Sequence, residues 1–216
     1  MIIIFDLDGT LLNTIDDLGY ACNYALEQTG YPTYPIEAYP AKVGNGINNL
    51  IRRALPVAEQ TEENVLRVRE YFVPYYNAHN CDFTRPYEGI EELLASLKAQ
   101  GHRLAVASNK YQAATEKIVT HFFPGVFDVI LGEREGVERK PNPQIVFDII
   151  QSLSPFTSHL SPLYIGDSLV DFETAKNAGV PFVACSWGFV ARERLVETGI
   201  KTIIDKPEEL KLLGKV

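Results

Sequence analysis

The interpretation of the whole chain starts from one N-terminal segment, Met1-Ile2-Ile3-Ile4-Phe5-Asp6-Leu7-Asp8-Gly9-Thr10-Leu11-Leu12. Residues 2–5 are all apolar and mostly β-branched, which is typical of a strand buried on both faces in a parallel sheet. Two carboxylates, Asp6 and Asp8, follow this run and precede Gly9. Because two partly desolvated acids repel each other, a bound cation would be a natural compensation. A hydrated turn is the alternative at this point, since Asp and Gly both favour tight turns.

Composition indicates a folded, acidic protein. The chain has 216 residues, of which 46% are hydrophobic and 22% are charged, and its formal net charge is -8. Nucleic acid is not expected as a partner, because binding to the phosphate backbone requires a basic face. No apolar run approaches the roughly 20 residues needed to cross a bilayer, so no membrane partner is expected. The thiols of Cys22, Cys81 and Cys185 have no Cys-x-x-Cys spacing, which favours inert thiols and a cytoplasmic location.

The order of predicted elements indicates an α/β fold. After the first strand, helical patterns follow one another up to about residue 84, with a kink or break expected near Pro74. From Pro86 onward, strands predicted at 103–107, 127–131, 163–165, 181–185 and 201–204 alternate with helices, and a last helix is expected from Pro207. This alternation predicts a doubly wound parallel-sheet (Rossmann-like) core. Because the first strand needs later strands as partners, we expect a core of residues 1–13 and 86–216 with an inserted helical cap domain at 14–85.

Polar side chains occur where several of the predicted strands end. Asp6 and Asp8 follow the first strand, Ser108 follows the second, and Asp167 follows a later one, with Asp171 one helical turn on. A loop between strands adds Lys140. Carboxylate oxygens suit Mg²⁺, and lysine, serine and backbone N–H groups at a helix start suit phosphate oxygens.

Each of these residues also has an ordinary explanation. Ser108 alone is typical of a helix N-cap, Lys140 alone of a surface lysine, and Asp167 alone of a capping acid. Their joint occurrence at successive strand ends favours a site for a divalent cation and a phosphoryl group.

The same motifs, in the same order, resemble those of the haloacid dehalogenase-like hydrolase superfamily. They are Asp6-Leu7-Asp8-Gly9-Thr10, Ser108-Asn109, Lys140-Pro141, and Gly166-Asp167 with Asp171. The resemblance covers the whole chain. Further segments resemble the phosphoglycolate phosphatases most closely: Val43-Gly44-Asn45-Gly46, Ser108-Asn109-Lys110, Gly166 to Gly179, and Ser186-Trp187-Gly188-Phe189.

The resemblance implies a role for each motif. Asp6 would be the nucleophile that forms an aspartyl-phosphate, and Asp8 would be the general acid and base. Mg²⁺ would bind Asp6, the backbone carbonyl of Asp8, and Asp167. The phosphoryl oxygens would be held by Lys140 together with Ser108 and Asn109. Thr10 and Asp171 would support the site, and Asp171 would orient Lys140 or a metal-bound water.

Substrate selection is expected to lie in the inserted segment. Gly44-Asn45-Gly46 is predicted to form a flexible turn that closes over a small phosphoester, and Arg52 or Arg53 could bind a substrate carboxylate. A solvated helix face explains both arginines equally well. Trp187 is expected to pack beside the site.

We therefore expect a Mg²⁺-dependent phosphomonoester hydrolase that acts on small phosphorylated metabolites, with 2-phosphoglycolate favoured. A sugar-phosphate phosphatase or a β-phosphoglucomutase-like mutase would use the same residues. Phospho-accepting signalling receivers also combine a doubly wound sheet with acids, a hydroxyl and a lysine, but they are shorter and lack the insertion. A catalytically silent binding protein is disfavoured by the intact acids and lysine. The expected oligomeric state is a monomer or a weak dimer.

Overall fold

A computed structural model describes residues 1–157 and 160–210 of the chain. The chain divides into two compact units. One unit comprises residues 1–13 together with 86–216, and the other comprises residues 14–85. They are called the core unit and the helical unit below, and each is described by itself.

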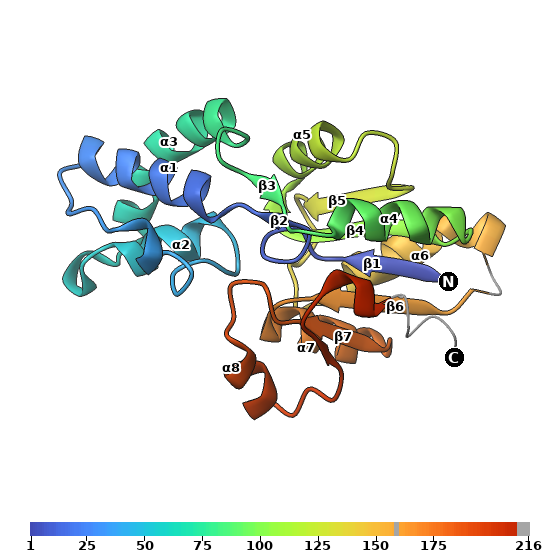
Figure 1. The fold of residues 1–216 in the computed structure, drawn as a ribbon. Coiled ribbons are helices and arrows are strands. Elements are labelled where there is room, and N and C mark those ends of the chain that lie inside the picture. The colour runs from blue at the N-terminus through green and yellow to red at the C-terminus, as the bar shows by residue number, and fades with distance from the viewer. Residues whose placement is uncertain (158–159, 211–216) are drawn as a thin grey trace. The chain divides into compact units, whose positions relative to one another are not determined.

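The core unit contains a six-stranded parallel sheet in the order β5-β4-β1-β6-β7-β8 (Figure 1). The strands are β1 (Ile2–Phe5), β4 (Arg103–Tyr111), β5 (Val129–Glu133), β6 (Pro162–Gly166), β7 (Phe182–Cys185) and β8 (Ile203–Ile204). In the register, Phe5 is paired with Val106 of β4 and with Ile165 of β6. The central position of β1 confirms the predicted doubly wound α/β fold, and it places the acids that follow β1 between the ends of β4 and β6.

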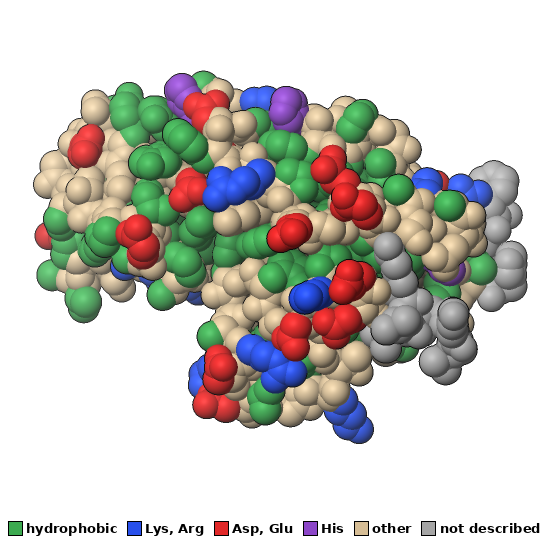
Figure 2. Space-filling view, viewed as in Figure 1, with side chains coloured by type: hydrophobic (Ala, Val, Ile, Leu, Met, Phe, Trp, Pro, Cys, Tyr) green, Lys and Arg blue, Asp and Glu red, His purple; other side chains and the backbone are tan. Residues whose placement is uncertain are grey.

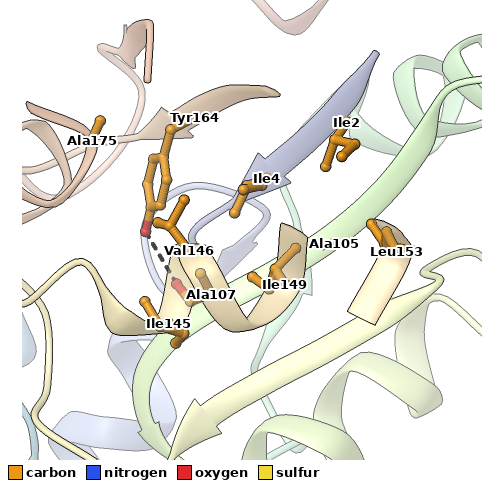
Figure 3. Close-up of a cluster of buried hydrophobic side chains, with 10 residues drawn as sticks. All are labelled: Ile2, Ile4, Ala105, Ala107, Ile145, Val146, Ile149, Leu153, Tyr164 and Ala175. Carbon is orange, nitrogen blue, oxygen red and sulfur yellow. Dashed lines mark hydrogen bonds between the residues drawn. The ribbon is translucent and has the colours of Figure 1, made fainter. Parts of the chain in front are cut away.

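Helices alternate with the strands of this sheet along the chain, and the last of them follows β8. They are α4 (Ile90–Ala99), α5 (Gln112–Phe122), α6 (Gln144–Thr157), α7 (Leu169–Ala178), α8 (Arg192–Glu197) and the 3-10 helix η3 (Pro207–Glu209). One buried cluster joins the sheet to α6 and α7 and is formed by Ile2, Ile4, Ala105, Ala107, Ile145, Val146, Ile149, Leu153, Tyr164 and Ala175 (Figure 3). Ile3 and Phe5 are also buried, and alternation along a strand directs them to the other face of the sheet. The predicted run of residues 2–5 is therefore buried on both faces.

Several element boundaries differ from the sequence prediction. β4 continues through Ser108 to Tyr111, with an irregular register against β5 between Ala107 and Tyr111, and α5 begins only at Gln112. The predicted end of this strand at residue 107 was wrong, because the strand carries on through Ser108, Asn109 and Lys110. β5 begins two residues later than expected, at Val129. Of the helix expected from Pro207, the structure has η3, and residues 211–216 lie outside the described residues.

The helical unit is built on α1 (Ile15–Gln28), α2 (Ile47–Ala54) and α3 (Glu62–His79), with the short 3-10 helices η1 (Ile36–Ala38) and η2 (Val57–Glu59). α1 packs against α3, and the rings of Tyr24 and Tyr75 stack with centroids 4.3 Å apart. The helix α3 is continuous through Pro74, so the break considered there does not occur. The short strands β2 (Leu12–Asn13) and β3 (Arg85–Pro86) form a two-stranded sheet where the chain passes between the units. The role of this unit as a cap stays a prediction.

The surface carries both signs of charge. On the face shown in Figure 2, acidic side chains are interspersed with Lys and Arg. Among the described residues, no helix combines the length and the apolar composition that a membrane span requires.

Candidate active site

The turn after β1 is held in place by backbone hydrogen bonds. Asp6 N–H donates to the carbonyl of Ile165 at 2.9 Å, so Asp6 still follows the sheet, and the carbonyl of Leu7 accepts from the N–H groups of residues 10–12. Gly9 has φ +86°, and an added Cβ there would lie 2.3 Å from a carboxylate oxygen of Asp167. Glycine is therefore required at this position, both for the backbone conformation and for the close approach of Asp167.

Lys140 lies at the centre of the site. Its side chain is only 2% exposed, and its Nζ lies within hydrogen-bond distance of four oxygen atoms. These are Asp6 Oδ1 at 2.8 Å, Asp171 Oδ1 at 2.8 Å, the Ala107 carbonyl at 2.9 Å and Tyr164 Oη at 3.1 Å. Although burial lowers the pKa of Lys140, the neighbouring charges of Asp171 and Asp6 raise it well above the ordinary value. The side chain is therefore a buried ammonium ion, and the surface-lysine interpretation is wrong.

Asn109 fixes the backbone that carries this lysine. Its Oδ1 accepts from Lys140 N–H at 2.9 Å, and its Nδ2 donates to the Lys140 carbonyl at 3.1 Å. The peptide bond between Lys140 and Pro141 is cis. Asn109 thus contacts the main chain of Lys140, rather than presenting a free amide.

Three buried carboxylates, those of Asp6, Asp167 and Asp171, have oxygen atoms within 4.8 Å of one another. Burial, and then the charge of Asp171, raise the pKa of Asp6 to about 7. Burial, followed by the charges of Asp171 and Asp6, also raises the pKa of Asp167 well above its usual range. One ammonium ion therefore does not compensate the acids fully. Hard oxygen donors with excess negative charge fit a divalent cation such as Mg²⁺.

Hydrogen bonds orient two of these acids. Asp171 Oδ2 accepts from both the backbone N–H and the hydroxyl of Ser168, in a capping box at the start of α7. Asp167 Oδ2 accepts from Phe189 N–H at 2.7 Å, and the hydroxyl of Thr10 lies 3.4 Å from Asp167 Oδ1. The carboxylates are thus pre-positioned by the protein.

Asp8 and Ser108 both contact a second buried lysine, Lys110. Asp8 Oδ2 forms an ion pair with Lys110 Nζ at 3.1 Å, and the Lys110 side chain is only 4% exposed. Ser108 is buried, and its Oγ accepts from Lys110 N–H at 3.1 Å. Ser108 lies within β4, so the simple N-cap interpretation is also wrong.

The residues expected to select the substrate belong to the helical unit. Gly44, Asn45 and Gly46 all have positive φ angles, as a tight turn requires. Arg53 Nη1 donates to the carbonyls of residues 42, 43 and 44, at 2.9, 3.1 and 2.9 Å. Arg52 donates to Asn49 at 3.1 Å and forms an ion pair with Glu62. Arg53 thus supports the turn, and the binding roles of all five residues stay predictions.

Sequence reasoning did not identify Lys110 and Tyr164 as members of the site. Lys110 belongs to the Ser108-Asn109-Lys110 segment, which carries the resemblance to phosphoglycolate phosphatases, and that segment was an available signal. Tyr164 lies within the strand predicted at 163–165, and nothing in the sequence distinguishes it there. Its pKa is raised well above the ordinary value, mainly by burial, so its hydroxyl is protonated. Trp187 donates from Nε1 to the Thr10 carbonyl at 3.0 Å, so it also supports the turn after β1.

Comparison with known proteins identifies the family. The model of the haloacid dehalogenase-like hydrolases matches residues 3–185. A phosphoglycolate phosphatase of Cereibacter sphaeroides is 32% identical over 190 residues, which cover 87% of this chain and 85% of the relative. The phosphoglycolate phosphatase of Aquifex aeolicus is 32% identical, with 88% of this chain and 86% of the relative covered.

A solved structure gives the same result. A protein of Lactobacillus delbrueckii subsp. bulgaricus, for which phosphoglycolate phosphatase activity is proposed, superimposes with a TM-score of 0.90 at 35% identity. The match covers 97% of this chain and 95% of that one. The present chain is therefore an enzyme that belongs to the haloacid dehalogenase-like hydrolase family, in the subgroup that resembles phosphoglycolate phosphatases.

Proposed function

We propose that the enzyme is a Mg²⁺-dependent phosphomonoester hydrolase that acts on small phosphorylated metabolites through an aspartyl-phosphate, with 2-phosphoglycolate as the favoured substrate. The observation that carries this proposal is the position of the Lys140 ammonium, 2.8 Å from both Asp6 and Asp171. A nucleophilic carboxylate beside a fixed cation suits attack on an anionic phosphoryl group.

In the first half of the proposed reaction, an Asp6 oxygen attacks phosphorus and the bond to the ester oxygen breaks. Asp8 protonates the leaving alkoxide, so that a neutral alcohol departs. In the second half, Asp8 removes a proton from water, which attacks the same phosphorus and releases inorganic phosphate and the Asp6 carboxylate. The ion pair with Lys110 would hold the Asp8 side chain in a fixed position for these two proton transfers.

Lys140 and Ser108 would bind the transferring oxygens, on which charge is spread in the transition state. Asn109 would act by fixing the Lys140 main chain, and Thr10 by holding Asp167. The cation would be held by Asp6, the Asp8 carbonyl and Asp167, and when bound it neutralises the negative charge shared by the carboxylates and the phosphoryl group. Asp171 is assigned to the support of Lys140, which its 2.8 Å contact favours.

The choice of substrate rests on the relatives, two of which carry the name phosphoglycolate phosphatase. The helical unit would act as the cap in this proposal, with the turn at Gly44-Asn45-Gly46 contributing to substrate selection. Arg52 would be the better candidate to bind a substrate carboxylate, because it contacts the side chains of Asn49 and Glu62, whereas Arg53 is bonded to three main-chain carbonyls of the turn.

The test begins with hydrolysis of p-nitrophenyl phosphate by the wild-type enzyme, with Mg²⁺ and with a chelator. Asp6→Asn should abolish turnover, whereas Asp205→Asn, an exposed acid bonded to Ser186 and Arg192, should not. Retained activity in Asp6→Asn would refute the proposal. A screen of phosphorylated metabolites then ranks the substrates, and NMR analysis of products from a hexose 1-phosphate separates a phosphatase from a mutase.

A further inference from the structure

Tyr164 is a buried polar residue to which the reaction outlined above assigns no role. It lies on β6 and is 0% exposed, and its ring packs in the apolar cluster beside α6. Figure 3 shows its hydroxyl directed toward Ala107, at the end of the apolar part of β4. Because a buried hydroxyl is costly unless it is hydrogen-bonded, phenylalanine would be the simpler choice for packing alone. The hydroxyl therefore calls for a specific explanation.

The Tyr164 hydroxyl meets the cluster around Lys140. It accepts from Lys140 Nζ at 3.1 Å, and it lies 3.3 Å from both Asp171 Oδ1 and the Ala107 carbonyl. A phenol has one proton to donate, so it can give that proton to Asp171 or to Ala107 while accepting from the lysine. The hydroxyl thus links the ammonium to two of its other oxygen partners.

An ammonium ion has three N–H bonds, and Lys140 has four oxygen atoms within reach. In the proposed reaction, Asp6 becomes an acyl phosphate and loses its negative charge. Tyr164 and Asp171 do not change, so they can keep two of the three N–H bonds throughout the cycle, which leaves the third for a phosphoryl oxygen. Precise placement of a charged donor matters most where charge develops in the transition state.

We propose that Tyr164 is a positioning residue for Lys140, which holds the ammonium in the orientation that stabilises the transferring phosphoryl group. This inference rests on the proposed function. It assigns the hydroxyl to transition-state stabilisation rather than to substrate binding.

The kinetic test compares Tyr164→Phe with a matched control, Tyr39→Phe. Tyr39 is also buried, and its hydroxyl donates to Asn23 Oδ1 at 2.7 Å within the helical unit. Per folded enzyme, Tyr164→Phe should lower kcat about tenfold and change KM less than about twofold, because the lost contact acts mainly in the transition state. Inhibition by orthovanadate, which mimics that state, should weaken by a similar factor, and competitive inhibition by inorganic phosphate should not.

Tyr39→Phe should leave all these quantities unchanged. An unchanged kcat in Tyr164→Phe, or an equal loss in both variants, would overturn the inference.

A second measurement does not depend on activity. The Lys140 ammonium should give a slowly exchanging ¹⁵N signal, which is absent in Lys140→Met and shows cross-relaxation with the Tyr164 ring in the wild-type protein. Tyr164→Phe should shift this signal or speed its exchange, and Tyr39→Phe should not. A signal without cross-relaxation to Tyr164 would contradict the contact even if the variant did not fold. A wild-type protein that shows the contact but hydrolyses no phosphoester would instead refute the proposed function.

Discussion

Clusters of charged side chains at the two ends of the parallel sheet differ in their ratio of acids to cations. At the carboxyl ends of the strands, Asp6, Asp167 and Asp171 crowd around the ammonium of Lys140. At the opposite end, Asp128 precedes β5 and is paired with Lys98 at 3.2 Å and with Arg103 at 3.0 Å. Three acids thus share one ammonium ion in the first cluster, whereas one acid has two cations in the second.

The pKa values of the acids follow this difference. Burial and Asp171 raise the pKa of Asp6, whereas the pKa of Asp128 is lowered. For Asp128, burial acts in the upward direction, but hydrogen bonds from Leu104 N–H, Lys98 and Arg103 outweigh it. Ionised Asp128 therefore stabilises the fold, and ionised Asp6 destabilises it. Groups held at a cost in stability are common at functional sites.

The largest expected effect is a difference in kcat between a lysine variant at one end of the sheet and a lysine variant at the other. Lys140→Met should lower kcat on p-nitrophenyl phosphate on the order of a hundred- to a thousand-fold, because it removes the charge that faces the phosphoryl group. Lys98→Met, which removes a cation from the opposite end, should leave kcat unchanged. The comparison would fail if both lysine variants lost activity to the same extent once the folded fraction is accounted for.

The second effect is a difference in the free energy of unfolding between an aspartate variant at each end of the sheet. It is measured by chemical denaturation with chelator present. Asp128→Asn should lower the free energy of unfolding by about 1–3 kcal/mol, because charge-assisted hydrogen bonds are lost. Asp6→Asn should leave the free energy of unfolding unchanged or raise it, because one of three repelling carboxylates is neutralised while Lys140 keeps Asp171. A marked loss of stability in Asp6→Asn would show that repulsion among the carboxylates of the site does not destabilise the fold.

The next effect concerns the pH dependence of the same two variants. The folded state holds a proton on Asp6 up to about pH 7, whereas an ordinary Asp has a pKa of 3.8. Stability relative to Asp6→Asn should therefore fall as pH rises from about 4 to about 7. For Asp128 the folded pKa is the lower one, so its contribution should be constant above about pH 5 and should be lost as pH falls further. Denaturation curves from pH 3.5 to pH 8 check both signs, and parallel pH profiles for the two variants would contradict the assignment.

The sequence predicts the apolar part of the fold well, because the buried run at residues 2–5 and the alternation of strands and helices are local patterns. It predicts the acids because they follow predicted strands, and Lys140 because the Lys140-Pro141 motif resembles that of the family. It does not show that β4 continues to Tyr111, since polar residues after an apolar run usually end a strand. Nor does it reveal Tyr164, which looks like any aromatic residue of a buried strand. The partner of Tyr164, Lys140, is 24 residues away, and only the folded chain brings the two together.

The most direct test of the account is to trap the reacting carboxylate. The enzyme is mixed with p-nitrophenyl phosphate and Mg²⁺, quenched in acid within the first turnover, and treated with borohydride, which reduces an acyl phosphate to the alcohol. Peptide mass mapping should then find homoserine in place of aspartate at position 6, with Asp8, Asp167 and Asp171 unchanged. Reduction at any of those three instead, or release of phosphate with no reducible group on Asp6, would contradict the account.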